Sequence, residues 1–492
     1  MKTKNKLVLR AMLIAFLTIN IGTFAQVGIG TITPDPSSML DVISTTKGML
    51  APRMTTAQKI AIVTPANGLL VYDTDLGKFC YYNGSGWIAL EANTSRDNFK
   101  LIKSATDLAP ELTAGGGTVY LLDENTYYEI NGIIVLAASI NLNNAYISGL
   151  DAGEDILVRG AGGTIFEGSE GGSIRNLTLT GGGTVFNITG SPTGSMLVQN
   201  TIIANMASVG TVSGLGLFFS NIVQFVGNAN GITYNNISSL LLSNQGWFDS
   251  NSGTYEKYTG TFNTIQKVSG LTTVNGTTIG FDVSSNPTVA SGFLSGTSFS
   301  GSGVYVKGYT TGSYAGFNFT NDWTVNCPGI PLESDDVASA NIYYTGNITT
   351  GFAQTVTNNN LFNLTGNSNS NTTAAVNLFR ASSPQFNRIT YNGHKTRTFQ
   401  ISASLSVRES TTVGNFYAFL IVKNGGIATE KVLTETNSLM RVNNTSDINS
   451  IAISGTVELQ PNDYIEIWGQ RLVVSGPNTT SIAVFSLNIN IK

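Results

Sequence analysis

A short pattern, Gly-Gly-Thr followed by two apolar residues, recurs in the first half of the chain. It reads GGTVY at 116–120, GGTIF at 162–166 and GGTVF at 182–186, with separations of 46 and 20 residues. A second series begins with asparagine, in NLTL at 176, NTII at 200 and NIVQ at 221. Such spacing is typical of a solenoid with twenty-odd residues per coil, the separations corresponding to two coils and one. The repeats therefore predict a β-helix-like shaft over residues 112–340.

The composition agrees with stacked β-coils. Charged residues make up only 11% of the chain, and glycine occurs 54 times, whereas about a quarter of a typical globular domain is charged. Identical charges in successive coils would lie about 4.8 Å apart, so such stacks contain few of them. Asparagine side chains can instead form ladders from coil to coil. An irregular β-sandwich is the alternative for this segment.

Charge and cysteine content exclude several function classes. The formal net charge is -4 and no basic patch stands out in the mature chain, so we expect no nucleic-acid partner. Cys80 and Cys327 lie far apart and form no disulfide framework. His394 is the single histidine, so one chain cannot hold a histidine metal cluster, and no metal-ligand spacing is present.

The N-terminal residues 1–25 have the pattern of a secretory signal peptide. Four basic residues precede a short apolar core at 11–19, and the small residues Thr23 and Ala25 suit cleavage before Gln26. An uncleaved anchor is the alternative. No later segment is apolar enough to span a membrane, so the mature chain is expected to be secreted, extracellular or on the cell surface.

Residues 26–90 are predicted to form a small β-unit. Strands are expected near residues 27–30 and 39–42, and a hairpin at Leu69–Tyr72 and Lys78–Tyr82. Gly28 and Gly30 do not form a phosphate loop, because a third glycine, a Lys-Ser/Thr pair and a following helix are missing. Residues 91–111 follow as a polar linker or neck.

This first unit resembles an N-terminal module of secreted Bacteroidetes proteins and phage tail-fibre-like proteins. The matching stretches are VGIGT, LDVISTTKGMLAPRMT, and GLLVYDTD followed by YYNGSGW. The resemblance covers about 65 residues and implies the base of a fibre or surface protein. It does not imply a catalytic activity.

The stretch AGGGTVYLLDENTYYEINGIIVLAASINLNNAYISGLD resembles the opening coils of pectate-lyase-like proteins. That resemblance lies in the pattern and implies a right-handed parallel β-helix. The fold class expected for the whole chain is therefore all-β, with this β-helix shaft followed by a C-terminal antiparallel jelly-roll β-sandwich.

Residues 341–492 show the two-residue alternation of half-buried strands. Examples are TFQISASLSV, FYAFLIVKNGG, SGTVELQPNDYIEIW and AVFSLNINI. In order and spacing these pieces resemble the C1q/tumour-necrosis-factor-like jelly roll. Asn462 stands where that family usually has glycine, and asparagine tolerates a left-handed turn. The resemblance implies a head domain that trimerises and binds a ligand.

Candidate chemistry is confined to acidic clusters. A β-helix glycosidase needs two carboxylates about 5–10 Å apart, and a lyase needs calcium with a basic residue. Glu333, Asp335 and Asp336 form the best candidate catalytic cluster, and could ligate Ca²⁺ as a cofactor through their carboxylate oxygens. Two further acidic groups lie at residues 151–155 and 167–170. Each group is flanked by Gly, Ser or Pro, so a solvated turn is the alternative for all of them.

Aromatic residues are the other candidates for function. Trp247, Tyr255 and Tyr258 fall where the apolar repeat loosens, and exposed aromatic faces can stack on sugar rings. The alternative is that they fill the core or an interface between chains.

These features together predict a secreted, structural and adhesive homotrimeric fibre that binds a glycan or a surface protein. The alternatives are a β-helix polysaccharide lyase or hydrolase, and a phage-type tail or head fibre. The predicted signal peptide argues against the phage alternative, because virion proteins assemble in the cytoplasm.

Overall fold

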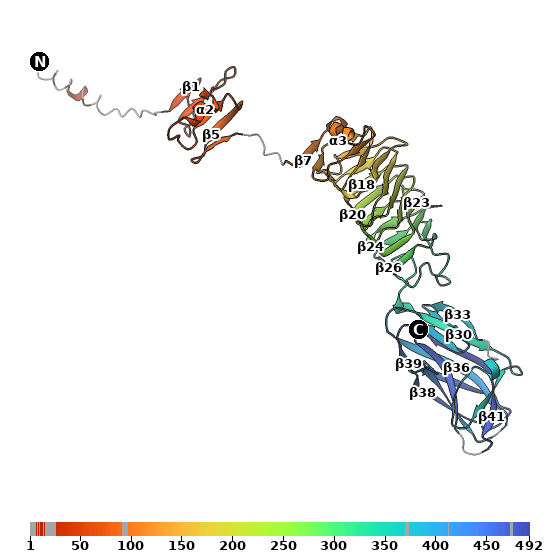
Figure 1. The fold of residues 1–492 in the computed structure, drawn as a ribbon. Helices are drawn as coiled ribbons and strands as arrows, with labels where there is room; N and C mark the ends of the chain where they lie inside the picture. Colours follow the sequence, from red (N-terminus) through yellow and green to blue (C-terminus); the bar gives the residue numbers. More distant parts are fainter. Residues whose placement is uncertain are drawn as a thin grey trace. The chain divides into compact units, whose positions relative to one another are not determined.

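The computed structural model describes residues 26–90, 97–369, 373–411, 413–472 and 476–492, and before residue 26 it describes residues 6, 8, 10–12 and 14. The chain forms two compact units, residues 1–96 and residues 97–492 (Figure 1). The predicted signal peptide lies almost wholly outside the described residues, as do residues 91–96 of the predicted linker. Among the described residues, no helix is long and apolar enough to cross a membrane.

Between residues 26 and 90, the first unit contains two small sheets and the short helix α2. The predicted hairpin is confirmed, because β4 and β5 pair antiparallel. The two strands predicted near its start are also confirmed, and they pair parallel as β1 and β2. The elements are β1 (Val27–Ile29), β2 (Leu40–Val42), β3 (Arg53–Met54), α2 (Thr56–Ile60), β4 (Leu70–Asp73), β5 (Lys78–Tyr82) and β6 (Trp87–Ala89).

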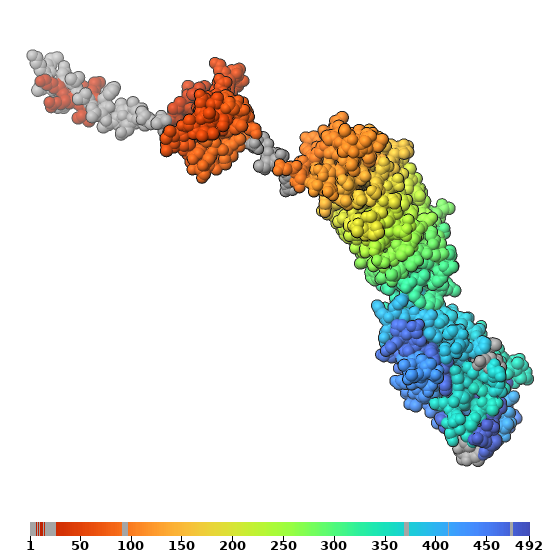
Figure 2. All heavy atoms as spheres, in the orientation of Figure 1, coloured from red at the N-terminus to blue at the C-terminus, as the bar shows by residue number. Residues whose placement is uncertain are grey.

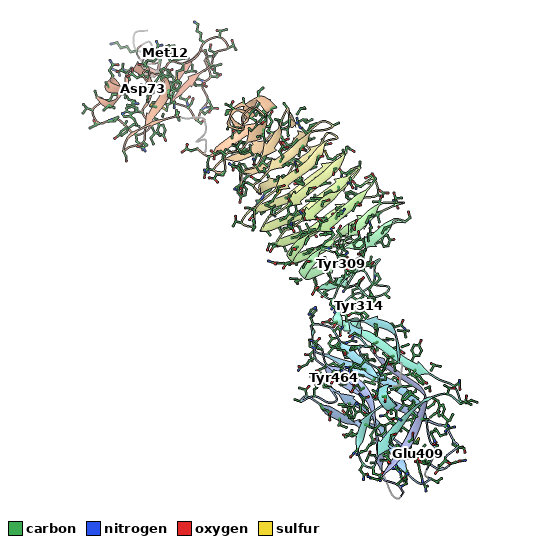
Figure 3. The ribbon with its side chains drawn as sticks, turned by 45° about the vertical axis from the view of Figure 1, so that its right-hand side comes forward. Met12, Asp73, Tyr309, Tyr314, Glu409 and Tyr464 are labelled. Atoms are coloured by element: carbon green, nitrogen blue, oxygen red, sulfur yellow. The ribbon has the colours of Figure 1, made fainter. Side chains whose placement is uncertain are left out.

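Asp73 connects the helix of the first unit to its four-stranded sheet, and it is labelled in Figure 3. Its carboxylate forms a buried ion pair with Lys59, at 2.6 Å between Nζ and Oδ2. Thr56 Oγ1 also donates to it, at 2.8 Å, as do the backbone N–H groups of Asp75 and Leu76. Burial disfavours the charged carboxylate, but these hydrogen bonds prevail and lower the pKa of Asp73 to about 2.

The second unit begins with a parallel β-solenoid, which confirms the predicted β-helix and excludes the irregular sandwich. Figure 1 shows its strands stacked coil upon coil, and in Figure 2 its orange to green atoms form a continuous surface. One wall is a nine-stranded sheet. Its strands are β8 (Val119–Leu121), β11 (Ser139–Asn141), β14 (Thr164–Gly168), β17 (Thr184–Thr189), β19 (Ser208–Ser213), β21 (Ile232–Asn235), β23 (Thr254–Thr259), β25 (Ile279–Asp282) and β28 (Val304–Lys307).

The other wall is a 14-stranded sheet, in which pairs of short strands merge into single long strands from β18 to β24 and separate again into β26 and β27. Its main path runs through β7 (Phe99–Ile102), β9 (Tyr127–Ile130), β12 (Tyr146–Ser148), β15 (Gly172–Arg175), β18 (Ser195–Ala204), β20 (Leu217–Val226), β22 (Ser239–Trp247), β24 (Thr261–Thr273), β26 (Thr288–Ser295) and β29 (Trp323–Asn326). The side strands are β10 (Ile133–Val135), β13 (Ile156–Val158), β16 (Thr178–Thr180) and β27 (Ser298–Ser300).

The Gly-Gly-Thr repeat corresponds to one wall of the solenoid. Its apolar residues lie in β8, β14 and β17. β8 and β14 are two coils apart, with β11 between them, whereas β14 and β17 are neighbours. The separations of 46 and 20 residues therefore correspond to two coils and one, as the repeat predicts.

The predicted polar linker differs from the structure at its C-terminal end. β7 pairs with β9, so residues from 99 onward already belong to the solenoid. The polar side chains here have structural partners: Lys100 pairs with Glu111 at 2.6 Å, and the carboxylate of Asp107 accepts the N–H groups of Lys103 and Ser104. Two short helices, η1 (Ala105–Leu108) and α3 (Ala109–Ala114), follow β7 and bury Leu108.

Five successive coils of the 14-stranded wall bend at a residue in the left-handed backbone conformation. Asn176 and Asn200 of the asparagine series occupy this position, Asn221 directly precedes it, and the predicted ladder is confirmed. Asn200 Nδ2 donates to Asn176 Oδ1, and Asn244 Nδ2 donates to Asn221 Oδ1, both at 3.1 Å. The residues with positive φ in successive coils are Asn176, Asn200, Ile222, Asn244 and Ser269.

The chain ends in an antiparallel β-sandwich of two six-stranded sheets. The predicted alternation is confirmed in β36, where Phe399, Ile401 and Leu405 are buried. Asn462 has a φ of 70°, as the turn requires. The strands are β30 (Ser339–Thr345), β31 (Phe352–Thr357), β32 (Leu361–Asn363), β33 (Ala374–Phe379), β34 (Ala381–Ser382), β35 (Arg388–Tyr391), β36 (Arg397–Glu409), β37 (Phe416–Lys423), β38 (Lys431–Arg441), β39 (Asn449–Leu459), β40 (Tyr464–Leu472) and β41 (Thr479–Ile491).

Candidate functional site

The predicted acidic cluster lies where the chain leaves the solenoid and enters the sandwich. Glu333 is buried, and its carboxylate accepts the backbone N–H groups of Asn318 at 2.8 Å and Phe319 at 3.0 Å. Burial raises the pKa of Glu333. Asp336 is exposed in the 3-10 turn η2 (Asp335–Val337).

Asp335 is also buried, and it joins the solenoid to the sandwich. One carboxylate oxygen pairs with the guanidinium of Arg380, and the other accepts the N–H groups of His394 at 3.0 Å and Lys395 at 2.8 Å. Arg380 also donates to the carbonyl oxygens of Trp323 and Glu333. Burial opposes ionisation, but the Arg380 hydrogen bond and charge prevail and lower the pKa of Asp335.

This geometry does not fit the catalytic role predicted for Glu333, Asp335 and Asp336. Both oxygens of Asp335 are already engaged by a cation and two amides, so they are poorly placed to relay a proton or to bind Ca²⁺. Glu333 serves the loop at 318–319 in the same way. In the described ranges, no group of three or more His, Cys, Asp or Glu residues could hold a metal ion.

Aromatic contacts strengthen this junction. Tyr309 and Tyr314, both labelled in Figure 3, lie at the C-terminal end of the solenoid. Trp323 Nε1 donates to Tyr309 Oη at 3.1 Å, and burial raises the pKa of Tyr309 to about 12. Tyr314 and Phe317 both contact the ring of Phe379 in the sandwich, Phe317 with a centroid distance of 3.9 Å.

A cavity of about 240 Å³ opens beside the junction. Asp322, His394 and Lys395 contribute polar groups to its wall, with 3.8 Å between His394 Nε2 and Asp322 Oδ1. Both of these side chains are exposed. Nothing in the sequence pattern indicated that Asp322 lies opposite His394.

Trp247, Tyr255 and Tyr258 do not lie on a surface. Each is fully buried in the solenoid core, with a relative exposure of 0%. The rings of Trp247 and Tyr255 stack at 4.5 Å, and Tyr258 contacts Phe281 at 4.4 Å. A sugar cannot reach these rings, so the predicted ligand-stacking role is wrong, and core packing accounts for all three.

A buried polar network surrounds these aromatic rings, and sequence reasoning missed it. Lys267 Nζ donates to Glu256 Oε1 at 2.9 Å and to Gln245 Oε1 at 3.0 Å. Tyr258 donates to Glu256, and Tyr255 to Gln245. Burial raises the pKa values of both tyrosines well above 10. The sequence feature that could have indicated this network is the presence of two charged residues, Lys267 and Glu256, at inward positions of the strands.

The outer face of the nine-stranded sheet carries a polar groove of about 390 Å³. Asn141, Glu167 and Asn187 lie opposite one another in successive coils, with Thr118 and Thr189 beside them. Amide and hydroxyl groups of this kind can hydrogen-bond to a sugar. Glu167 is the one acidic residue among the described residues that line the groove.

A second cavity, of about 400 Å³, lies on the sandwich. Hydroxyl groups of Thr365, Thr373 and Ser383 line it together with Gln385 and Phe386. Phe386 is 36% exposed. This cavity thus combines hydroxyl groups with a partly exposed aromatic ring.

The first unit buries very little apolar surface by itself. Val71 and Cys80 are its buried apolar side chains, whereas 15 large apolar side chains between residues 26 and 90 are exposed. In β1 and β2 no residue is buried. A unit of this size needs a larger core, and oligomerisation is one way to provide it.

Comparison with solved structures gives distant likenesses. One is bacteriophage CBA120 tailspike protein 4, enzymatically active domain, with 11% identity, a TM-score of 0.25, and coverage of 90% of this chain and 77% of that one. Another is Pantoea stewartii WceF, a glycan biofilm modifying enzyme, with 11% identity and a TM-score of 0.22; the match covers 88% of this chain and 71% of that one. A third is Eiger TNF from S. frugiperda, with 12% identity and a TM-score of 0.22; the match covers 32% of this chain and 92% of that one. At such low TM-scores these likenesses carry no argument about activity.

Comparison with protein families is informative for the first unit. No curated protein matches the chain. Residues 28–100, which cover the described part of the first unit from Gly28 and extend into β7, match the family described as phage tail-like trimerisation region.

Proposed function

We propose that this protein is a secreted, homotrimeric fibre subunit of phage-tail type, which binds a glycan or a protein on a surface. The observation that carries the proposal is the match of residues 28–100 to a phage tail-like trimerisation region. In this proposal the first unit joins three chains, and the solenoid and the sandwich present the binding surfaces.

The exposed apolar side chains of the first unit support trimerisation. Strands β1 and β2 expose Val27, Ile29, Leu40 and Val42, and their burial between chains would supply the missing core. Each such side chain contributes roughly 1.5–3 kcal/mol when fully buried. In this proposal the sandwich, which resembles the C1q/tumour-necrosis-factor family, adds a second trimer contact.

The polar groove on the nine-stranded sheet supports an adhesive role. Its amide and hydroxyl groups offer hydrogen bonds to a glycan, while hydrolysis requires a second carboxylate about 5–10 Å from the first. Glu167 has no acidic partner among the described groove residues. Binding is therefore favoured over cleavage, and a polysaccharide lyase or hydrolase remains the second candidate, with Glu167 as its acid.

A glycan array probed with the mature chain tests the adhesive role. We expect binding to one class of glycan without release of sugar. The Asn187→Trp variant fills the groove and should lose at least tenfold in affinity. The matched Thr233→Trp variant alters the same outward row two coils away and should bind normally.

Two outcomes would contradict this proposal. If the array releases reducing ends or unsaturated sugars, and Glu167→Gln abolishes their release, the chain is an enzyme. If Asn187→Trp and Thr233→Trp bind equally well, the groove is not the binding surface.

A further inference from the structure

The two walls of the solenoid differ in the chemistry of their outer faces. Among the exposed large apolar side chains on described solenoid strands, seven lie on the 14-stranded sheet and one, Val304, on the nine-stranded sheet. Those on the 14-stranded sheet are Leu101, Tyr127, Ile133, Val135, Tyr146, Ile222 and Phe293. The exposed large apolar side chains of the solenoid strands therefore gather on one wall.

One outward row of the 14-stranded sheet concentrates this apolar character. Consecutive coils place its members directly opposite one another. They are Phe99, Tyr127, Tyr146, Ser173, Leu197, Phe219, Leu241, Gln266, Phe293 and Thr324. Seven of these ten are aromatic or aliphatic, and none is charged.

The corresponding row on the nine-stranded sheet is polar. It contains Glu167, Lys257, Asp282 and Lys307, in register with Asn187, Thr211 and Thr233. The apolar row is thus a property of one wall, and does not follow from the low charge of the whole chain. Contiguous apolar patches of this kind mark interaction surfaces.

We infer that the apolar row is the surface along which the solenoids of three copies pack against one another; this inference rests on the proposed trimer. The row begins at Phe99, inside the segment that matches the trimerisation region. Phe99 and Tyr127 already stack at 6.0 Å. The last residues of the matched segment, in β7, are therefore also the start of the row.

The symmetry of a trimer explains why the row that forms the contact should carry no charge. In a three-fold assembly of parallel chains, a row that faces the axis meets the same row of the other two copies. Charged residues would then lie against identical charges, which is unfavourable away from water. Aromatic and aliphatic residues have no such conflict.

Cysteine labelling of the full chain tests this interface. Leu241→Cys lies in the apolar row on β22, and Thr233→Cys lies in the polar row on β21 of the same coil. Both positions are partly exposed in the single chain. Cys80 and Cys327 are buried, so the unsubstituted chain provides the background.

We expect maleimide to label the Leu241→Cys variant at least tenfold more slowly than the Thr233→Cys variant. A short bis-maleimide should cross-link two chains of the Leu241→Cys variant. It should not cross-link chains of the Thr233→Cys variant. Both variants must keep the mass and circular dichroism of the unsubstituted chain, and Phe219→Cys replaces Leu241→Cys if the latter misfolds.

The outcomes separate the interface from the trimer itself. If the unsubstituted chain is trimeric but the two variants label equally fast and neither cross-links, the interface inference is wrong while the trimer stands. If the unsubstituted chain is monomeric, the proposed function fails first.

Discussion

At the scale of single residues, Ile222 holds a backbone conformation that its branched side chain disfavours. Its φ is 55°, like that of Asn200 and Asn244 in the neighbouring coils. A left-handed backbone costs L-residues about 1–2 kcal/mol, and asparagine tolerates it better. The replacement Ile222→Asn should therefore raise the free energy of unfolding of the solenoid by about 1 kcal/mol.

Differential scanning calorimetry measures this as a higher midpoint of the solenoid transition. Ile133→Asn is the matched control, since Ile133 is also exposed on the 14-stranded sheet and has no positive φ. If both replacements shift the midpoint equally, backbone strain at Ile222 is not the cause.

Asp73 makes the first unit sensitive to acid. Its pKa is about 2 in the folded chain, and about 3.9 when unperturbed. Because folding lowers this pKa, the carboxylate stabilises the fold fully above about pH 4. The contribution is lost as pH falls through the folded pKa.

The Asp73→Asn variant should therefore lose most of the decline in unfolding midpoint between pH 4 and pH 2. Calorimetry at several pH values measures it. Asp75→Asn removes a nearby exposed carboxylate and should keep the decline. An unchanged decline in Asp73→Asn would show that other groups cause the acid sensitivity.

At the scale of elements, the buried pair of Lys267 and Glu256 holds β24 against β23. Removing one member of such a pair leaves an uncompensated buried charge, at a cost of about 3–5 kcal/mol. We expect Lys267→Met to destabilise the solenoid by that amount. The double variant Lys267→Met with Glu256→Gln should regain most of the loss, because no unpaired charge remains.

Calorimetry of the single and double variants distinguishes the pair from simple packing. Equal destabilisation in both would mean that the loss comes from the changed shape of the core. Lys423→Met provides a less buried comparison, since the side chains of its pair with Asp463 are 17% and 16% exposed, and we expect a smaller loss of stability there.

Secondary-structure elements could be predicted from the sequence where a local pattern repeats along the chain. The Gly-Gly-Thr and asparagine series predicted coil length and ladder, because each coil places the same residue at the same corner. Alternation predicted β36 in the same way. The polar residues at 99–111 led to the prediction of a linker, whereas they belong to the solenoid. Lys100 and Glu111 form an ion pair there, and the sequence pattern does not show this pairing.

The candidate site was far less predictable, because long-range pairing is invisible to local patterns. Asp335 and Arg380 lie 45 residues apart in sequence. Because this pairing could not be predicted, the acidic cluster was interpreted as either solvated or catalytic. Trp247 and Tyr255 are 0% exposed, although the apolar repeat loosens around them. Their inward direction follows from the phase of each coil, which the pattern near residue 250 does not reveal.

At the scale of the whole molecule, the chain combines three parts. The first unit leaves its apolar side chains exposed and matches a trimerisation region. The solenoid carries an apolar row on the outside of one wall and a polar row on the outside of the other. The sandwich is joined to the solenoid by the buried pair of Asp335 and Arg380. A trimer would cover the first unit and one solenoid wall, and leave the polar groove free.

The mass of the mature chain in solution tests this account most directly. Sedimentation velocity at micromolar concentration should give a single species with three times the mass of one chain. Replacing Ile29 and Leu40 with aspartate in β1 and β2 should weaken that species, because both side chains are exposed in the single chain. A stable monomer of the unsubstituted chain at the same concentration would contradict the account.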